Sequence, residues 1–272
     1  MQRMPVGAML SVALPETEME QCIAQRQEEL GHVEVSAVNG PGQIVIGGEI
    51  ETIEHWTKYF SSEGVWTRHL LTSHAYHTWL MDEASREFAT AVGKVEKHAP
   101  RLNVISCVSG KWLTAAEAQS GDYWGRQMRE PVRFGAGVNE VLAESGRVVV
   151  EAGPGSGLSG LVLMHAGGAA PVLLSLLPSG RGEANESEAV VRALARLWLE
   201  GVEVKWEEWW RGERRRRVKL PTYPFERVRC WIDADPINKI PEPINAETLS
   251  EEEIFQQQLQ IMSSQLDLLN QF

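Results

Sequence analysis

The order of strand and helix signals in the first 71 residues is the strongest constraint on the fold. Pro15 opens a polar helix that ends before Gly31, and the turn signal NGPG at 39–42 predicts a hairpin between two apolar runs. A second helix is predicted over 50–62. Strands are predicted at 7–14, 33–38, 43–48 and 65–71. The order βαββαβ is typical of the ferredoxin-like unit, in which two helices pack on one face of a four-stranded antiparallel sheet.

The remainder of the globular part, which we expect to end near Trp210, has the pattern of an α/β layer. Apolar residues recur at helical spacing over 84–95 and predict an amphipathic helix that stops before Pro100. Asn185 and Glu188 resemble a capping box and predict the start of another helix. Short apolar runs that are typical of strands covered on both faces lie at 103–108, 147–150 and 172–177.

Charge and cysteine content exclude several classes of partner. The formal net charge is -11 at pH 7, which argues against nucleic acid and anionic membranes because both are themselves anionic. Cys22, Cys107 and Cys230 are far apart and odd in number, which favours a reducing cytoplasm and no zinc site. No run reaches the roughly 18 apolar residues that span a bilayer. We expect a soluble cytoplasmic protein whose partners are small molecules or other proteins.

Two short motifs bear on nucleotide and acyl chemistry. The segment 155–160 (GSGLSG) matches G-x-G-x-x-G after a predicted strand, but dinucleotide binding also requires an acidic residue about 20 positions later. The run 172–178 offers none, so a tight strand-to-helix turn is favoured. A serine acyltransferase on an α/β scaffold requires a nucleophile elbow, G-x-S-x-G. The sequence contains no such elbow.

The segment SHAYH at 73–77 follows the fourth predicted strand directly. A loop between two subdomains faces a cleft, and such loops commonly hold catalytic groups. His74 and His77 are therefore candidates for catalysis or ligand binding, and the alternative is a pair of satisfied core or surface histidines. No further histidine or carboxylate completes a recognisable ligand set, so we expect no metal.

The C-terminal region changes character twice. Pro221 and Pro224 predict an extended linker over 220–233, and its aromatic residues Tyr223, Phe225 and Trp231 are expected to dock on another surface. Prolines at 236, 241 and 243 then predict a semi-rigid spacer.

From Ser250 the sequence predicts a helix, with an N-cap followed by three glutamates at 251–253. Two heptads make a lone helix marginal in water, so we expect it to form on pairing with its own copy or as a docking element. The alternative is a frayed tail that packs on its own domain. The expected a/d seam consists of Phe255, Leu259, Met262, Leu266 and Leu269.

Six segments, in this order, resemble the acyltransferase domain of modular type I polyketide synthases, a relative of malonyl-CoA:carrier-protein transacylases. They are MQRMPVGAML, VNGPGQIVIGG, TSHAYHTWLM, YWGRQMREPVRF, VVVEAGPGSGLSGL and LPTYPFERVRCWID. The resemblance implies an α/β fold in which a ferredoxin-like βαββαβ subdomain, 1–71, is inserted in an α/β-hydrolase-like acyltransferase core. That core would be incomplete here, with its C-terminal part at 72–210. A post-acyltransferase linker at 211–233, a spacer at 234–249 and an amphipathic helix at 250–272 would follow.

The resemblance implies transfer of a malonyl-type group from coenzyme A to a serine, and then to the phosphopantetheine thiol of an acyl carrier protein. His77 matches the general base of the family, and His74, Tyr76 and Asn39 are the expected substrate-binding residues. The motif at 74–77 resembles the one associated with malonyl selection, with Tyr76 in place of phenylalanine. Thr78-Trp79 replaces the usual small residue and proline. Acyl-CoA is then a substrate, no bound cofactor is implied, and ketosynthase and carrier-protein domains are the expected partners.

In the family, the nucleophile elbow and the arginine that pairs with the malonyl carboxylate precede the stretch that matches Met1-Gln2. We therefore expect this chain to lack both groups and to be inactive alone. One interpretation is a fragment of an acyltransferase whose chemistry needs the missing half. The other is a non-catalytic interaction module that docks on a ketosynthase or carrier protein. The sequence leaves open whether the chain is itself an enzyme.

Overall fold

The structure is a computed structural model of the 272-residue chain. It describes residues 1–167, 171–178, 185–214, 216, 218–225 and 250–269. The chain divides into two units, Met1–Arg211 and Gly212–Phe272, which are described separately below. Among the helices of the described residues, none combines the length and the apolar character that crossing a membrane would require.

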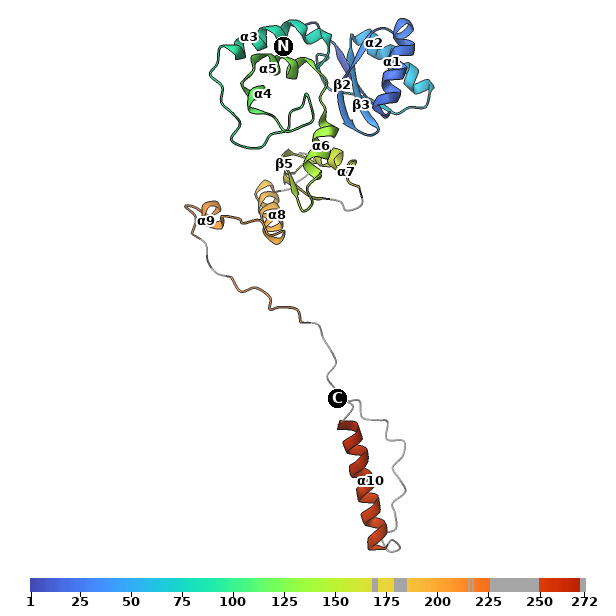
Figure 1. Cartoon of the computed structure of the whole chain (residues 1–272), viewed down its shortest axis with the longest axis vertical. Coiled ribbons are helices and arrows are strands. Elements are labelled where there is room, and N and C mark those ends of the chain that lie inside the picture. Colours follow the sequence, from blue (N-terminus) through green and yellow to red (C-terminus); the bar gives the residue numbers. More distant parts are fainter. Residues whose placement is uncertain (168–170, 179–184, 215, 217, 226–249, 270–272) are drawn as a thin grey trace. The chain divides into compact units, whose positions relative to one another are not determined.

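The first unit begins with a four-stranded antiparallel sheet of strand order β2-β3-β1-β4. Helices α1 and α2 cover one face of it (Figure 1). The predicted βαββαβ order is confirmed, although the first and last strands are shorter than expected. The elements are β1 (Ala8–Val12), α1 (Glu16–Leu30), β2 (Val33–Gly40), β3 (Gln43–Gly48), α2 (Ile50–Ser62) and β4 (Thr67–His69).

The core of this part lies between the sheet and the two helices. Trp56 and Phe60 of α2 are its largest members and are completely buried. The indole of Trp56 donates a hydrogen bond to the carbonyl of Gly31, at 3.1 Å, so its one polar group is satisfied. Burial of each large apolar side chain contributes about 1.5–3 kcal/mol to stability. The other buried members are Leu10, Val12, Met19, Val33, Ile44, Ile46 and Ile53.

The opposite face of the sheet is covered by the segment that follows β4. Ala75 of this segment is completely buried and packs with Met9 and Val45 from the sheet. Two glycines make this close approach possible. A Cβ atom on Gly7 would lie 2.9 Å from the backbone nitrogen of Ala75, and one on Gly47 would lie 2.9 Å from the Cγ2 of Thr78. The residues 73–78 can therefore lie directly on the strands.

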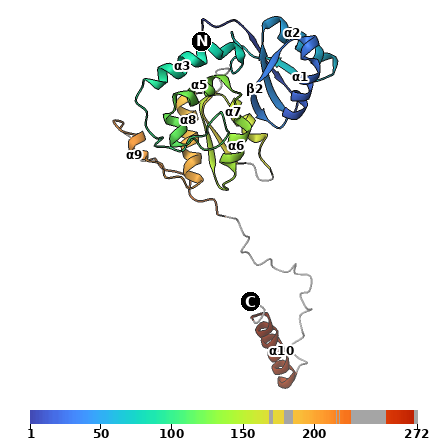
Figure 2. The same ribbon diagram turned by 45° about the horizontal axis from the view of Figure 1, so that its top comes forward.

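Helices α3 (Asp82–Gly93) and α5 (Gly121–Arg129) come next and lie side by side, as Figure 2 shows. A short 3-10 helix, η1 (Trp79–Met81), leads into α3, and α4 (Ala115–Gln119) precedes α5. Thr114 caps α4 with a complete capping box. Helix α3 confirms the amphipathic helix predicted over 84–95.

The last part of the first unit contains a parallel pair of strands, β5 (Val148–Pro154) and β6 (Val172–Leu177). Both were predicted. Helix α8 begins as expected, because the side chain of Asn185 accepts hydrogen bonds from the backbone N–H groups of Ser187 and Glu188. The whole is thus a mixed α/β fold with an antiparallel and a small parallel sheet. Helices α6 (Phe134–Leu142), α7 (Gly157–Leu163) and α8 (Glu186–Leu199) lie around the pair. Helix α9 (Trp206–Trp209) follows α8.

The predicted strand at 103–108 is wrong. Only an isolated bridge between Ile105 and Trp112 forms there. The hydroxyl of Ser106 accepts hydrogen bonds from the backbone N–H groups of Val108 and Ser109, both at 3.3 Å, and Gly110 adopts a φ of 66°. These local bonds bend the chain into a turn, because a serine side chain competes with a strand ladder for backbone donors.

The second unit contains α10 (Glu251–Leu269). Before it, residues 218–225 carry neither helix nor strand. Trp231 and the proline-containing spacer at 234–249 lie outside the described residues.

Candidate active site

The backbone of His77 is held in an unusual conformation. Its φ is 60°, the left-handed region that costs a residue with a side chain on the order of 1–3 kcal/mol. Thr78, which is completely buried, stabilises the turn. Its hydroxyl donates to the carbonyl of Ala75 at 2.7 Å and accepts from the N–H of Leu80 at 3.3 Å. The buried turn therefore fixes the backbone from which the side chain of His77 projects.

The imidazole of His77 is anchored to the end of α5. Its Nδ1 lies 3.0 Å from the carbonyl oxygen of Glu130, the C-cap residue of that helix. Only a ring protonated at Nδ1 can donate to a carbonyl, so the neutral ring carries its lone pair on Nε2. Burial lowers the pKa of His77 below its usual range, and backbone hydrogen bonds with Glu130 and Gln127 raise it in part. The neutral form, which can accept a proton, therefore predominates at pH 7.

His77 lines a cavity of about 680 Å³ on the side of α3 and α5. Tyr76 and Phe88 contribute aromatic surface to it, and Glu87 and Gln127 contribute polar groups. A second cavity, of about 350 Å³ between α6, β5 and α7, is lined mostly by apolar side chains, and none of its described lining residues is a histidine. The larger cavity combines the His77 base with space for a ligand. Two further cavities, of about 380 and 370 Å³, are lined by His165.

His74 has a different environment from His77. It is buried, with 6% of its surface exposed, and both ring nitrogens have partners: the hydroxyl of Ser73 at 2.8 Å and the carbonyl of Met4 at 3.2 Å. It does not line the cavity of His77, but its ring lies 6.0 Å from that of Tyr76, which does. His74 is therefore a neighbour of the cavity lining and is not part of it.

Asn39, at the end of β2, is not among the described residues that line this cavity. Its carbonyl accepts a hydrogen bond from the Nε2 of His165 at 3.0 Å, and the Nδ1 of His165 lies 3.0 Å from the side chain of Asn139. The structure thus brings His77 and Tyr76 together, places His74 behind them and leaves Asn39 at the junction with α6 and α7.

The turn at 155–160 is closed by the chain itself. Gly155 has a φ of 91°, and the carboxylate of Glu151 accepts from the N–H of Leu158 at 3.1 Å and from the N–H and hydroxyl of Ser159 at 2.8 and 2.6 Å. These bonds lower the pKa of Glu151. The carboxylate of Glu151 thus occupies the N-terminus of α7, where a bound phosphate would have to lie. This agrees with the interpretation of the segment as a tight strand-to-helix turn.

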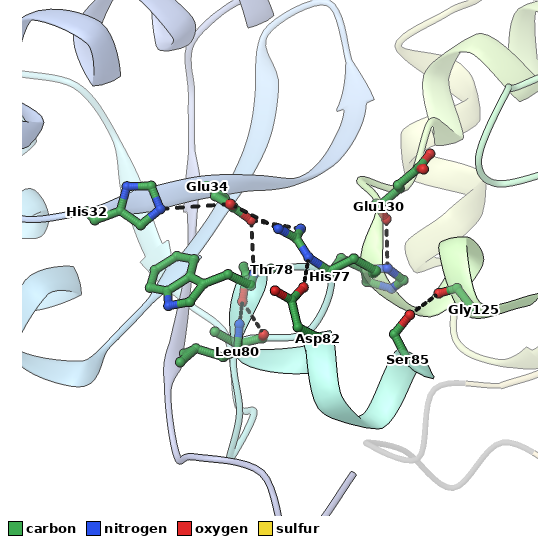
Figure 3. A network of polar contacts seen from close by, with 12 residues as sticks. His32, Glu34, His77, Thr78, Leu80, Asp82, Ser85, Gly125 and Glu130 are labelled. Carbon is green, nitrogen blue, oxygen red and sulfur yellow. Dashed lines mark hydrogen bonds and ion pairs between the residues drawn. The ribbon is translucent and has the colours of Figure 1, made fainter. Parts of the chain in front are cut away.

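Sequence reasoning did not identify the polar network behind His77 (Figure 3). Glu34 of β2 accepts a bidentate pair of hydrogen bonds from Arg129, at 2.8 and 3.1 Å, and Arg129 also pairs with Asp82. The only sequence signal for Glu34 was that a charged residue occurs within a predicted strand. Nothing in the sequence pattern connected Glu34 with Arg129, 95 positions away.

Comparisons with known proteins agree with these observations. A model of the acyl transferase domain family matches residues 1–165. The chain is 36% identical over 236 residues to polyketide synthase GfsA of Streptomyces halstedii, which covers 86% of this chain and 3% of that protein.

Two solved structures have similar folds. One is the acyltransferase domain from the second module of the salinomycin polyketide synthase, with a TM-score of 0.69, 32% identity and coverage of 82% of this chain and 51% of that one. The other is the acyltransferase domain of ZmaA, with a TM-score of 0.71, 27% identity and coverage of 80% and 50%. The chain thus spans about half the length of these solved domains. With the histidine turn, the helix that anchors it and the family match in agreement, the chain belongs to the acyl transferase domain family.

Proposed function

We propose that this chain supplies the histidine side of an acyltransferase site that transfers a malonyl-type group from coenzyme A to a carrier protein. The observation that carries the proposal is the orientation of His77. Its ring is fixed through Nδ1 to the carbonyl of Glu130, beside the cavity of about 680 Å³. This arrangement keeps Nε2 as the basic atom, which is what activation of a hydroxyl or thiol requires.

The nucleophile is a serine outside these 272 residues, because the sequence contains no G-x-S-x-G. Nε2 of His77 takes the serine proton as the hydroxyl oxygen attacks the thioester carbonyl of the acyl-CoA. The imidazolium then returns the proton to the departing coenzyme A thiolate. In the second half, His77 takes the proton of the phosphopantetheine thiol, which attacks the acyl-serine, and returns it to the serine oxygen.

The C-terminal end of α5 stabilises the imidazolium form of His77. The carbonyl of Glu130 lies at the C-terminal end of the helix, where the helix dipole favours a positive charge. The imidazolium that forms in each half-reaction is thereby stabilised without any movement of the ring. Metal and bound cofactor have no part in this scheme.

Substrate choice is assigned to Tyr76, which lines the cavity, and to His74, which supports Tyr76 from the buried side. His74→Ala should therefore change the choice of acyl group more than the rate. Asn39 is assigned a substrate-binding role by family resemblance alone.

The organisation proposed for the chain follows the relatives. Residues 1–71 form a ferredoxin-like subdomain, 72–210 the C-terminal part of a hydrolase-like core and 211–233 a linker, followed by a spacer at 234–249 and a helix at 250–272. The match to GfsA, a polyketide synthase, supports ketosynthase and acyl carrier protein domains as partners.

Intact-mass spectrometry tests the proposal. The chain alone, incubated with malonyl-CoA, should remain unmodified. When a complementing segment that contains G-H-S-x-G is added, a malonyl adduct should appear on that segment. His77→Ala should slow its formation by roughly 10²- to 10⁴-fold. A stable malonyl adduct on a serine of this chain, or unchanged loading with His77→Ala, would contradict the proposed role.

A further inference from the structure

The carboxylate of Glu34 joins the two segments that determine where His77 points. One is the end of α5, whose Glu130 carbonyl anchors the imidazole. The other is the backbone just after His77, where the N–H of Trp79 donates to Oε2 of Glu34 at 3.0 Å. We propose that Glu34, on the second strand of the antiparallel sheet, is a positioning residue that fixes the orientation of the His77 ring. This inference rests on the proposed function of His77.

The link to α5 passes through Arg129, the neighbour of Glu130. Its guanidinium forms a bidentate pair with Glu34, and its Nε donates to Asp82 at the start of α3. A bidentate pair fixes the plane of the guanidinium as well as its distance. Arg129 and Glu34 are each 28% exposed, so the pair is partly shielded from water. The last turn of α5 is thereby tied to the sheet and to α3.

The link to the histidine turn depends on a departure from the family pattern. Proline commonly occupies the position of Trp79 in the resembling motif, and a proline has no N–H to donate. Here the N–H is present and bonded to the same carboxylate that holds Arg129. Figure 3 shows Glu34, Asp82 and His77 within one network of polar contacts, with Glu130 beside His77.

The orientation of the His77 ring depends on two segments that are far apart in the sequence, so it requires a contact that joins them. The backbone of His77 lies at a φ of 60°, whereas the acceptor for Nδ1 comes from residue 130. A shift of either segment lengthens the bond from Nδ1 to the carbonyl of Glu130 and releases the Nδ1-protonated tautomer. Glu34 is hydrogen-bonded to the turn after His77 and to Arg129, and it therefore holds these two segments in a fixed relative position.

The test is nitrogen-15 NMR of the histidine side chains in the whole 272-residue chain, with His77 assigned by comparison with His77→Gln. In the unsubstituted chain the neutral ring should be protonated at Nδ1. In Glu34→Gln the Nδ1-protonated signal should lose intensity and an Nε2-protonated population should appear. The tautomer is the appropriate readout because removing a carboxylate that contacts Arg129 and His32 also changes the local charge. Glu34→Asp, which keeps the charge but shortens the reach, should show the same change.

Glu16→Gln is the matched control. Glu16 of α1 pairs with Arg133, just beyond Glu130, and these side chains are 32% and 37% exposed. Glu16→Gln therefore removes a comparable ion pair between α1 and the segment that follows α5. It leaves the contacts of Trp79 and Arg129 with Glu34 in place. The tautomer of His77 should be unchanged in Glu16→Gln.

A second pair of variants tests the backbone donor. Trp79 is the first residue of η1, a position that accepts proline. Trp79→Pro removes the N–H and Trp79→Ala keeps it, while both remove the indole. The Nε2-protonated population should be larger in Trp79→Pro than in Trp79→Ala. This comparison decides the proposal if Glu34→Gln fails to fold.

Kinetics with the complementing serine segment separate this inference from the proposed function. Glu34→Gln should lower kcat by up to about 10²-fold, with KM changed much less, because misplacement of a catalytic group by about 1 Å can cost that much. If no preparation loads malonyl while the tautomer responds as stated, the proposed function is wrong and the positioning role stands. If Glu34→Gln, Glu34→Asp and Trp79→Pro all leave the tautomer of His77 unchanged, the positioning role is wrong.

Discussion

At the scale of the residue, the protonation of His77 controls the chemistry that we propose. Burial lowers its pKa below the ordinary value of 6.5, and backbone hydrogen bonds offset only part of that effect. The acid limb of kcat/KM, measured with the complementing serine segment, should therefore have its midpoint below pH 6.5. A midpoint above pH 6.5 would show that the carbonyls of Glu130 and Gln127 outweigh burial.

The same pKa shift affects stability. Since the folded state binds the His77 proton less readily than the unfolded chain, the unfolded state gains protons first as the pH falls. The contribution of neutral His77 to stability is present above about pH 6.5 and is lost as the pH falls toward the lowered pKa. In His77→Gln this part of the pH dependence of the melting temperature should disappear.

The prediction of His77 as a site residue rests on a local signal. Two histidines directly after a strand, in a loop between two subdomains, indicate a site without knowledge of distant contacts. Sequence reasoning could not distinguish the environment of His74 from that of His77, since their hydrogen-bond partners, Met4 and Glu130, lie 70 and 53 positions away. Glu34 was missed for the same reason, because its role depends on Arg129.

At the scale of the element, the predictions held where periodicity and turn chemistry agreed. The glycine-rich turn signal at 39–42 and the two helix signals on either side of it correctly predicted the antiparallel sheet. The apolar runs at 147–150 and 172–177 predicted β5 and β6. The error at 103–108 came from a run whose apolar residues are typical of a strand but whose Ser106 and Gly110 form a turn. Local hydrogen bonds to a serine hydroxyl are not visible in a hydropathy pattern.

The close approach of the histidine turn to the sheet yields an element-scale prediction. In Gly47→Ala the new Cβ would lie 2.7 Å from the Oγ of Ser36 and 2.9 Å from the Cγ2 of Thr78. Overpacking of this kind costs about 1–3 kcal/mol, and the melting temperature should fall by about 2–4 °C for each kcal/mol. Malonyl loading with the complementing segment should also slow, because Thr78 follows His77 directly.

Gly42→Ala is the control for this prediction. Gly42 lies in the turn of the same hairpin, and a Cβ there has no atom within 4 Å. Its melting temperature and loading rate should remain close to those of the unsubstituted chain. Equal effects of the two substitutions would show that the hairpin, and not the packing of the histidine turn, is what alanine disturbs.

At the scale of the whole molecule, exposed aromatic side chains after the first unit predict an interface. Tyr223 and Phe225 are 74% and 77% exposed, and their rings lie 5.0 Å apart. A cluster of this kind marks a surface for association. Tyr223→Ala combined with Phe225→Ala should weaken binding to a ketosynthase domain, the partner proposed above, in a pull-down, and Thr222→Ala should not. Unchanged binding in the double variant would count against a docking role for this linker.

The helix α10 begins with a well-formed cap. The hydroxyl of Ser250 accepts from the N–H of Glu253 at 3.4 Å, and the carboxylate of Glu253 accepts from the N–H of Ser250 at 2.9 Å. These bonds lower the pKa of Glu253. The cap defines where the helix starts, but a helix of 19 residues still requires packing of an apolar face for stability in water.

Part of the apolar face of α10 is exposed. Phe255 and Leu259, the first two residues of the predicted seam, are 61% and 46% exposed. We expect the seam to pair with its own copy, so the full chain should show a larger mass at high concentration in sedimentation equilibrium. Leu259→Glu should abolish the concentration dependence because it places a charge in the seam. Gln257→Glu adds the same charge outside the seam and should preserve the association. If the chain remains monomeric at every concentration, self-pairing is wrong, and an increase in helical circular dichroism on mixing with candidate partner domains would then identify α10 as a docking element.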